Sequence, residues 1–208
     1  MLNRKIKAEL DEYLGFNSST LFQNSKNLAR VFGGAIRDII TGDKIHDIDI
    51  LLGSKTLNHV EGVLQQNGYR FFEQLNGKDL QEMYSEIHII TEPKTWIKGD
   101  KIVQLIRPSI NSKGSEEAYI TGFRDLISNV DLSCCGVSWD GQEFHEDFPN
   151  AFLHCQCKVF SENKQAKMYS KKRIHQRIWK LSERGWKEIQ NSDAINRDLK
   201  LKLLEQGI

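Results

Sequence analysis

The stretch VFGGAIRDIITGDKIHDIDILL, residues 31–52, constrains the fold more than any other part of the chain. An apolar segment runs into a Gly-Gly pair, which predicts a strand followed by a tight turn. The residues after the pair predict one or two helical turns that stop at Gly42. Apolar residues then alternate with Asp47 and Asp49. This alternation predicts a second strand, with two carboxylates at its start.

The glycine pair and the two aspartates also suggest a common chemistry. Gly33 and Gly34 would let a polyanion approach the backbone, and a helix that begins there would offer free N–H groups. Asp47 and Asp49 are two residues apart, so on a strand both carboxylates leave the same face. Two such close charges need compensation, and Mg²⁺ prefers one or two carboxylates together with substrate phosphates. Each feature alone is most often a turn or a solvated strand face, but together they predict a phosphate-handling site.

The remaining chain predicts an α+β fold, with a small mixed sheet, helices on one face and a helical C-terminal segment. We expect one domain over residues 1–160 and a helical extension over residues 161–208. The expected helices are 2–14, 35–41, 54–68, 115–128, 164–184 and 193–205, and the expected strands are 28–32, 47–52, 69–75, 86–93, 100–108 and 131–139. Residues 151–160 fit a helix or a strand, and we favour an edge strand.

Composition places the chain among ordinary globular proteins, because 39% of its 208 residues are hydrophobic and 27% are charged. The net charge of +1 hides a basic segment between Ser161 and Lys187, which holds nine Lys or Arg residues and two Glu. Its charges occur together with aromatic residues, a combination that suits single-stranded nucleic acid. A solvated helix face with an apolar core stripe is the alternative interpretation. The residues predicted to contact RNA are Lys171, Lys172, Arg173 and Arg177.

Four cysteines occur as two close pairs, Cys134 with Cys135 and Cys155 with Cys157. They lack the C-x-x-C spacing of zinc knuckles, so buried structural thiols are the favoured interpretation and a zinc site the alternative. The N-terminus shows no apolar core of a signal peptide, and no apolar run approaches the length of a membrane span. We therefore expect a cytoplasmic protein with no membrane partner.

The motif GGAIRDIITGDKIHDID resembles the head-domain signature of bacterial poly(A) polymerases and class II CCA-adding tRNA nucleotidyltransferases, within the polymerase-β-like superfamily. The positions that match that signature are Gly33, Gly34, Arg37, Asp38, Gly42, Asp47 and Asp49. The resemblance implies a nucleotidyltransferase head fold. It also implies Mg²⁺ or Mn²⁺ at the catalytic carboxylates Asp47 and Asp49. An NTP would be bound near the other matched positions, Gly33, Gly34, Arg37 and Asp38. The alternative for Arg37 and Asp38 is an ion pair that locks the turn.

Two weaker similarities follow. VDLSCCGVSWDG is similar to a later strand of that family, and the match makes Asp131 a candidate third catalytic carboxylate. The alternative is that Asp131 only forms local hydrogen bonds at the start of a strand. KKRIHQRIWKLSERGW is loosely similar to the start of the family's neck helix. The sequence departs from the family at Gln104, which aligns with an acidic residue on the neighbouring strand. The family's nucleotide-selecting helix is not recognisable here.

Together these features predict an enzyme that transfers a nucleotidyl group from an NTP to a hydroxyl, with an RNA 3′ end, tRNA included, as the preferred acceptor. Two alternatives stay open. One is nucleotidyl transfer to a protein or a small molecule. The other is a nucleotide- or RNA-binding module that has lost catalysis, which the neutral side chain of Gln104 would favour.

Overall fold

The computed structural model describes residues 1–23, 29–74, 90–108, 130–164, 166 and 170–206. Its described helices are α1 (Leu2–Leu14), α2 (Gly34–Thr41), α3 (Ser54–Gln66), α6 (Ala151–Gln156), α7 (Lys171–Glu183) and α8 (Asp193–Glu205). Its described strands are β1 (Ala29–Phe32), β2 (Ile48–Leu52), β3 (Arg70–Gln74), β4 (Ile90–Lys98), β5 (Lys101–Pro108), β6 (Val137–Trp139), β7 (Phe144–Glu146), β8 (Val159–Phe160) and β9 (Lys187–Glu188). Two short 3₁₀ helices are η1 (Ser18–Phe22) and η3 (Ser133–Cys135).

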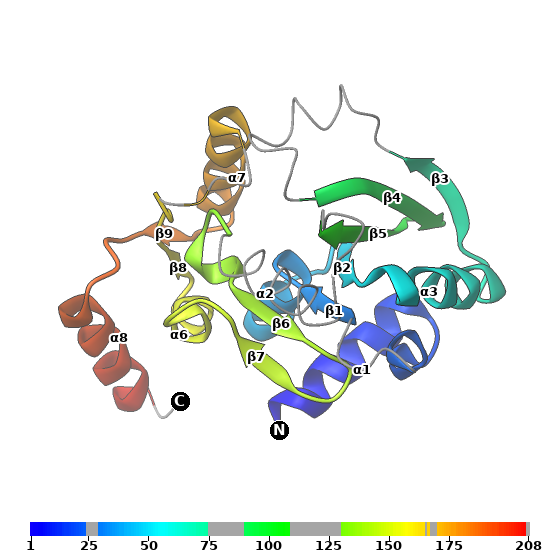
Figure 1. The fold of residues 1–208 in the computed structure, drawn as a ribbon. Coiled ribbons are helices and arrows are strands. Elements are labelled where there is room, and N and C mark those ends of the chain that lie inside the picture. The colour runs from blue at the N-terminus through cyan, green and yellow to red at the C-terminus, as the bar shows by residue number, and fades with distance from the viewer. Residues whose placement is uncertain (24–28, 75–89, 109–129, 165, 167–169, 207–208) are drawn as a thin grey trace.

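Seven of these strands form one mixed sheet in the order β3-β4-β5-β2-β1-β6-β7 (Figure 1). The β2–β5 pair is parallel, and the other neighbouring pairs of this sheet are antiparallel. The chain reaches β5 from β2 through α3 and the β3–β4 pair, which makes the parallel neighbour possible. The predicted α+β fold with a small mixed sheet is confirmed.

The glycine-rich segment folds as predicted, as strand, turn, helix and strand. Gly33 has φ 71° and ψ −126°, a conformation that a residue with a Cβ rarely adopts. Its N–H donates to the carbonyl of Val137 at 3.0 Å, which ties the turn to β6. At the other end of α2, Gly42 has φ 73° and closes the helix as a left-handed cap.

The core explains why the N-terminal helix forms. Ile6, Leu10 and Leu14 recur every four residues on α1, and all three are fully buried. This apolar stripe joins a core cluster that includes Ile36 of α2 and Ile50 of β2. Since α1 packs against α2, it buttresses the turn that precedes α2.

Two predicted strands are wrong in part. Residues 151–156 form helix α6, where the carboxylate of Glu146 accepts a hydrogen bond from the Phe152 N–H at 2.9 Å. This cap comes from outside the apolar run, so the run alone could not indicate a helix. The expected strand 131–139 begins only at Val137. The segment before it forms η3, and Gly136 lies so close to Phe148 that a Cβ there would clash.

The C-terminal helices are confirmed, with α7 beginning at Lys171 within the expected span and α8 at its expected bounds. The expected helix 115–128 lies outside the described residues. Strand β8 pairs in parallel with β9, so neighbouring strands cross the expected boundary at residue 160, and the division into two domains stays a prediction. In the described part of the chain, no helix is both long enough and apolar enough to cross a membrane.

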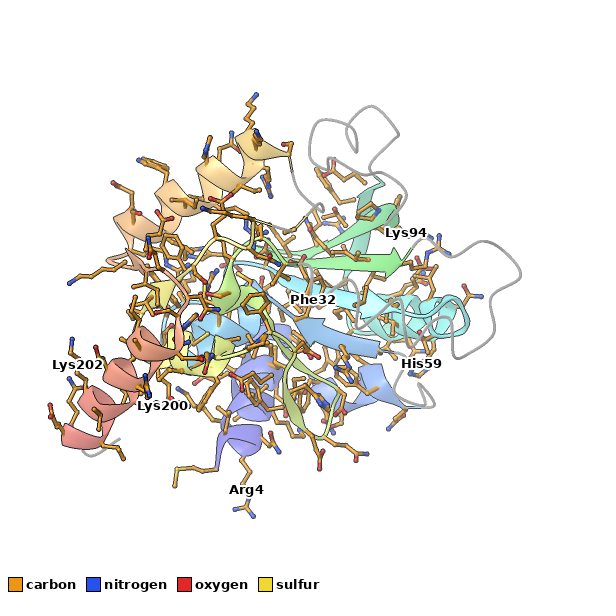
Figure 2. All side chains as sticks on the ribbon, turned by 60° about the vertical axis from the view of Figure 1, so that its left-hand side comes forward. Arg4, Phe32, His59, Lys94, Lys200 and Lys202 are labelled. Carbon is orange, nitrogen blue, oxygen red and sulfur yellow. The ribbon has the colours of Figure 1, made fainter. Side chains whose placement is uncertain are left out.

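Helix α8 is attached to the rest of the molecule through a buried histidine. The Ser133 hydroxyl lies 2.7 Å from Nδ1 of His154, and Oδ1 of Asn196 on α8 lies 3.0 Å from Nε2. The Ser161 N–H also donates to the Ser133 hydroxyl, at 2.9 Å. Figure 2 shows Lys200 and Lys202 on the same helix, which lies at one edge of the view.

Candidate active site

A cavity of about 240 Å³ lies between the N-terminal half of α2, the strands β2 and β5, and helix α7. Of the described residues that line it, five are Arg or Lys and three are Asp. The acidic groups at the sheet and the basic groups on α7 therefore face one common space. Such a site suits a ligand that combines negative charge with a bound cation.

Asp47 and Asp49 form the acidic wall of the cavity. Asp49 is the second residue of β2, and Asp47 immediately precedes that strand and is exposed. The Oδ1 atom of Asp49 is buried and has no hydrogen-bond partner among the described residues. Burial and, next, the nearby charge of Asp47 raise the pKa of Asp49 to about 7. The structure thus brings the two predicted carboxylates together and leaves one oxygen without compensation.

Gln104 lies directly beside Asp49. In the parallel pairing of β2 with β5, Asp49 is the register partner of Gln104, and both side chains line the cavity. The position that the resemblance expects to be acidic therefore carries a neutral amide next to the carboxylate pair. A neutral amide offers an oxygen ligand but no negative charge for a dication.

Helix α7 supplies the basic wall. Arg173, Arg177, Lys180 and Arg184 recur every three or four residues, which places them on one face of the helix, and all four line the cavity. Nε of Arg173 is buried without a hydrogen-bond partner among the described residues. Within that part of the chain, Lys180 also makes no ion pair. Two cations of this wall are therefore available to a ligand.

Asp131, the predicted third carboxylate, lies behind this wall. It is fully buried and is not one of the residues that line the cavity. Its Oδ1 lies 3.0 Å from Nη1 of Arg177. Burial raises the pKa of Asp131, while Arg177 acts in the opposite direction. The position of Asp131 suits a role in holding Arg177.

Arg37 and Asp38, predicted to bind the nucleotide, line the cavity but also pair with each other. Nη2 of Arg37 lies 2.7 Å from Oδ1 of Asp38. Arg184 joins them, with Nη2 at 2.8 Å from the same Asp38 oxygen and 3.1 Å from Oδ2 of Asp43. These ion pairs join the C-terminal end of α7 to α2 at one end of the cavity.

A thiol contributes to the same network. Nη1 of Arg37 donates to Sγ of Cys135 at 3.4 Å, and Nη2 of Arg177 donates to it at 3.3 Å. A hydrogen bond from the Cys134 side chain and the two nearby guanidinium groups lower the pKa of the Cys135 thiol. Cys134, Cys135 and Cys155 are free and buried, as the sequence predicts, and Cys157 is half-buried.

The predicted RNA-contact residues divide between two environments. Lys171 and Lys172 are exposed at the start of α7, whereas Arg173 and Arg177 are half-buried and point into the cavity. The sequence analysis did not place Arg173 and Arg177 in the cavity, and it did not single out Lys180 or Arg184. Their helical spacing is visible in the sequence and could have placed them on one face.

Tyr13 is a further residue that sequence reasoning missed. Its hydroxyl donates to the carbonyl of His46 at 2.9 Å and accepts from the N–H of Ile102 at the same distance. The side chain thereby joins the residue before Asp47 to the start of β5. No local sequence signal indicates this role, because the three residues are far apart in the chain.

The donor set fits a divalent cation shared with phosphates. Asp47 and Asp49 supply two carboxylates, and the buried Oδ1 of Asp49, which has no hydrogen-bond partner among the described residues, is a place where a positive charge would be favourable. Among the described residues, no group of three or more His, Cys, Asp or Glu side chains could hold a metal ion alone. A cation here would need further oxygen ligands from a substrate.

Comparison with solved structures places this architecture beside CCA-adding enzymes. A CCA-adding enzyme with CTP matches with a TM-score of 0.59 at 13% identity, over 98% of this chain and 46% of that one. The same kind of enzyme with ATP matches with a TM-score of 0.54 at 13% identity, over 95% and 42% of the two chains. The Thermotoga maritima CCA-adding enzyme complexed with tRNA-CCA matches with a TM-score of 0.53 at 12% identity, over 95% and 44%.

These likenesses show the fold. The chain spans less than half of the length of these enzymes. No protein-family model matches the sequence, and the comparison with curated proteins finds no match. The comparison of tertiary structures therefore supports the fold class expected from the glycine and aspartate motif. Sequence comparison finds no match, because the identity to these enzymes is only 12–13%.

Proposed function

We propose that this chain is a nucleotidyltransferase that takes an NTP and transfers its nucleotidyl group to the 3′ hydroxyl of an RNA. The observation that carries the proposal is the cavity in which Asp47 and Asp49 face the cations of α7. The fold shared with CCA-adding enzymes, some solved with CTP, ATP or tRNA, supports the choice of substrates.

The residues of the cavity would divide the work of binding. Gly34 lines the cavity in the first turn of α2, where backbone N–H groups suit phosphate oxygens. Arg173 and Lys180 would pair with the triphosphate from the opposite wall. The ion pairs of Arg37 and Asp38 would keep α2 in place beneath it.

Asp47 and Asp49 would hold Mg²⁺ or Mn²⁺ together with the phosphates. Such a cation, when bound, neutralises the triphosphate and polarises the attacking hydroxyl. In the reaction the acceptor oxygen bonds to the α-phosphorus, the bond to the β-phosphate oxygen breaks, and pyrophosphate leaves. The hydroxyl proton is released to water. The chain's own contribution is to align the two substrates and to balance their charge.

Asp131 is assigned a positioning role rather than a ligand role. Because its carboxylate is buried against Arg177, it would keep that guanidinium beside the carboxylate pair. The Cys135 thiol accepts a hydrogen bond from Nη2 of the same guanidinium. Together, Asp131 and Cys135 would fix the position of the Arg177 guanidinium relative to Asp49.

The test is incorporation of labelled NTPs into an RNA oligonucleotide with Mg²⁺ or Mn²⁺. We expect extension by the wild type and a loss of at least about 1,000-fold in Asp49→Ala, the scale of removing an electrostatic catalytic group. Asp198→Ala, the same change at an exposed residue of α8 outside the cavity, is the matched control and should retain RNA extension within a few-fold. Label that enters protein but no RNA would redirect the proposal to a protein acceptor.

Gln104 favours a second candidate, a nucleotide- or RNA-binding module without catalysis. Its neutral side chain stands in register with Asp49, where an acid would add charge for a cation. Nucleotide binding with no transfer to any acceptor, unchanged by Asp47→Ala, would support this candidate and refute the enzyme. Gln104→Glu separates the two further, because activity gained by that change would identify the missing charge as the cause.

A further inference from the structure

Helix α7 carries a third face that the cavity does not use. Its apolar stripe, Ile174, Ile178 and Leu181, packs towards the body, and its basic stripe lines the cavity. On the remaining side, Trp179 is 63% exposed. The other three tryptophans of the chain, Trp96, Trp139 and Trp186, are each at most 8% exposed. One large aromatic ring is therefore left in solvent on the helix that forms the basic wall.

The exposed ring adjoins the mouth of the cavity. Gln176 lines the cavity, and it lies four residues after Lys172 and three residues before Trp179. Residues at these spacings are neighbours on a helix surface. Lys172, Gln176 and Trp179 thus form one continuous patch that runs from the cavity rim onto the outer surface, and we call this patch the outer platform.

The chemistry of the outer platform suits an unpaired nucleotide. An exposed indole offers a flat face for a base, and Lys172, two helical turns before it on the same side of α7, offers a charge for a phosphate. The exposed Phe71 and Phe72 lie on β3, and the exposed Leu201 and Leu204 lie on α8. Both elements lie away from α7 in the two views (Figures 1 and 2). Of these exposed apolar groups, Trp179 is the one that combines an aromatic face, nearby cations and continuity with the cavity.

We infer that the outer platform binds the single-stranded end of an RNA acceptor, with an unpaired base stacked on Trp179 and a neighbouring phosphate paired with Lys172. The strand would then pass Gln176 and present its terminal hydroxyl to the cavity. The inference rests on the proposed function for its choice of RNA. It adds where the acceptor lies and which residues outside the cavity recognise it.

Intrinsic fluorescence tests this directly, because Trp179 is the one exposed tryptophan of the chain. A single-stranded RNA 12-mer is titrated into the 208-residue chain with EDTA and without NTP, so that no reaction takes place. We expect quenching of the wild type that saturates. In a fluorescence-anisotropy titration of a labelled RNA 12-mer, a signal that does not depend on Trp179, we expect an RNA affinity weakened about ten-fold in Trp179→Ala, within the range measured for base stacking. Trp179→Phe should retain most of the affinity, because it keeps a ring.

Phe72→Ala, which removes an equally exposed ring from β3, is the matched control and should bind RNA like the wild type. Lys172→Gln should weaken binding and reduce the salt dependence by about 0.7 in log–log slope, the loss of one phosphate contact to a single strand. Thermal unfolding of each variant checks that the fold is retained, which the exposure of both rings favours.

Unquenched fluorescence, or wild-type RNA affinity in Trp179→Ala, would overturn the outer platform. If RNA is nevertheless extended with NTP, the proposed function stands and the acceptor path alone is refuted. If quenching and the Trp179→Ala loss are observed but no acceptor is ever labelled, the platform stands and the proposed reaction fails. Quenching by a protein acceptor in place of RNA would refute the RNA assignment.

Discussion

Two carboxylates in the same part of the fold, one lining the cavity and one buried outside it, have different charged neighbours. Asp49 opens onto the cavity, and its Oδ1 has no hydrogen-bond partner in the described part of the chain. Asp131 is closed off from the cavity, and its Oδ1 lies 3.0 Å from Nη1 of Arg177 as an ion pair, although neither of its carboxylate oxygens has a hydrogen-bond partner in the described part of the chain. Burial raises the pKa of both groups, and the charge of Arg177 opposes that rise in each case.

We infer from this difference that Asp49 serves a ligand and that Asp131 serves the fold. A buried charge is costly unless it is paired, so a protein retains an unpaired one mainly where something binds it. Asp131 has its partner within the chain. Asp49 has a like charge, Asp47, as its neighbour, and its partner would come from outside. Four predictions test this contrast, beginning with the largest effect.

Breaking the closed pair should cost the most stability. Asp131→Ala leaves Arg177 beside a buried apolar surface without its carboxylate, and we expect a loss of about 3 kcal/mol in the free energy of unfolding. Urea denaturation measures it. The double variant Asp131→Ala, Arg177→Met should lose clearly less than the sum of the two single changes. Additive losses would show that the two residues do not stabilise each other.

Removing the charge of Asp49 should stabilise the protein, whereas breaking the Asp131–Arg177 pair destabilises it. The pKa of Asp49 is about 7 in the folded protein and 3.8 is its ordinary value, so its contribution to stability is complete at low pH and is lost as pH rises through 7. Asp49→Asn cannot ionise. It should therefore stabilise the protein at pH 8 by about 2 kcal/mol relative to its effect at pH 5.

Urea denaturation of wild type and Asp49→Asn at both pH values checks this second prediction. Asp47→Asn is the companion variant, and it should give a smaller gain because Asp47 is exposed. Equal effects of Asp49→Asn at pH 5 and pH 8 would contradict the view that its charge is uncompensated.

Adding charge at the open site should strengthen cation binding. Gln104→Glu places a third carboxylate beside Asp49, and we expect Mn²⁺ to bind about ten-fold more tightly, equivalent to about 1.4 kcal/mol. Calorimetric titration without NTP measures the affinity independently of any activity. Gln176→Glu makes the same chemical change on the α7 wall and is the matched control. An equal gain in both variants would mean that general charge, not the position beside Asp49, attracts the ion.

The smallest expected effect concerns His154, whose ring contacts Ser133, two residues after Asp131. Burial lowers the pKa of His154, so its contribution to stability is present above its ordinary value of 6.5 and is lost as pH falls below it. Between pH 7 and pH 5, the wild type should therefore lose about 1 kcal/mol more of its free energy of unfolding than His154→Gln, whose side chain cannot gain a proton. Unfolding curves at the two pH values measure the slope.

The sequence by itself determined the centre of the fold and the core of the candidate site. The order from β1 to β5 follows from local signals, because glycines with positive φ and alternating apolar residues act within a few positions of themselves. Asp47 and Asp49 could be recognised as a pair for the same reason, because they lie two residues apart on one expected strand. The sequence also placed Gln104 correctly on the strand beside them, since that strand has a clear apolar pattern.

Only the tertiary structure decided what surrounds that pair. Arg173 and Arg177 were expected to be RNA contacts, and they lie in the cavity because the apolar stripe of α7 packs onto the core and turns them inward. Asp131 was expected to be catalytic, and it lies behind Arg177 because η3 replaces the start of the expected strand. These positions depend on contacts between residues more than 40 apart, for which a single sequence carries no local signal.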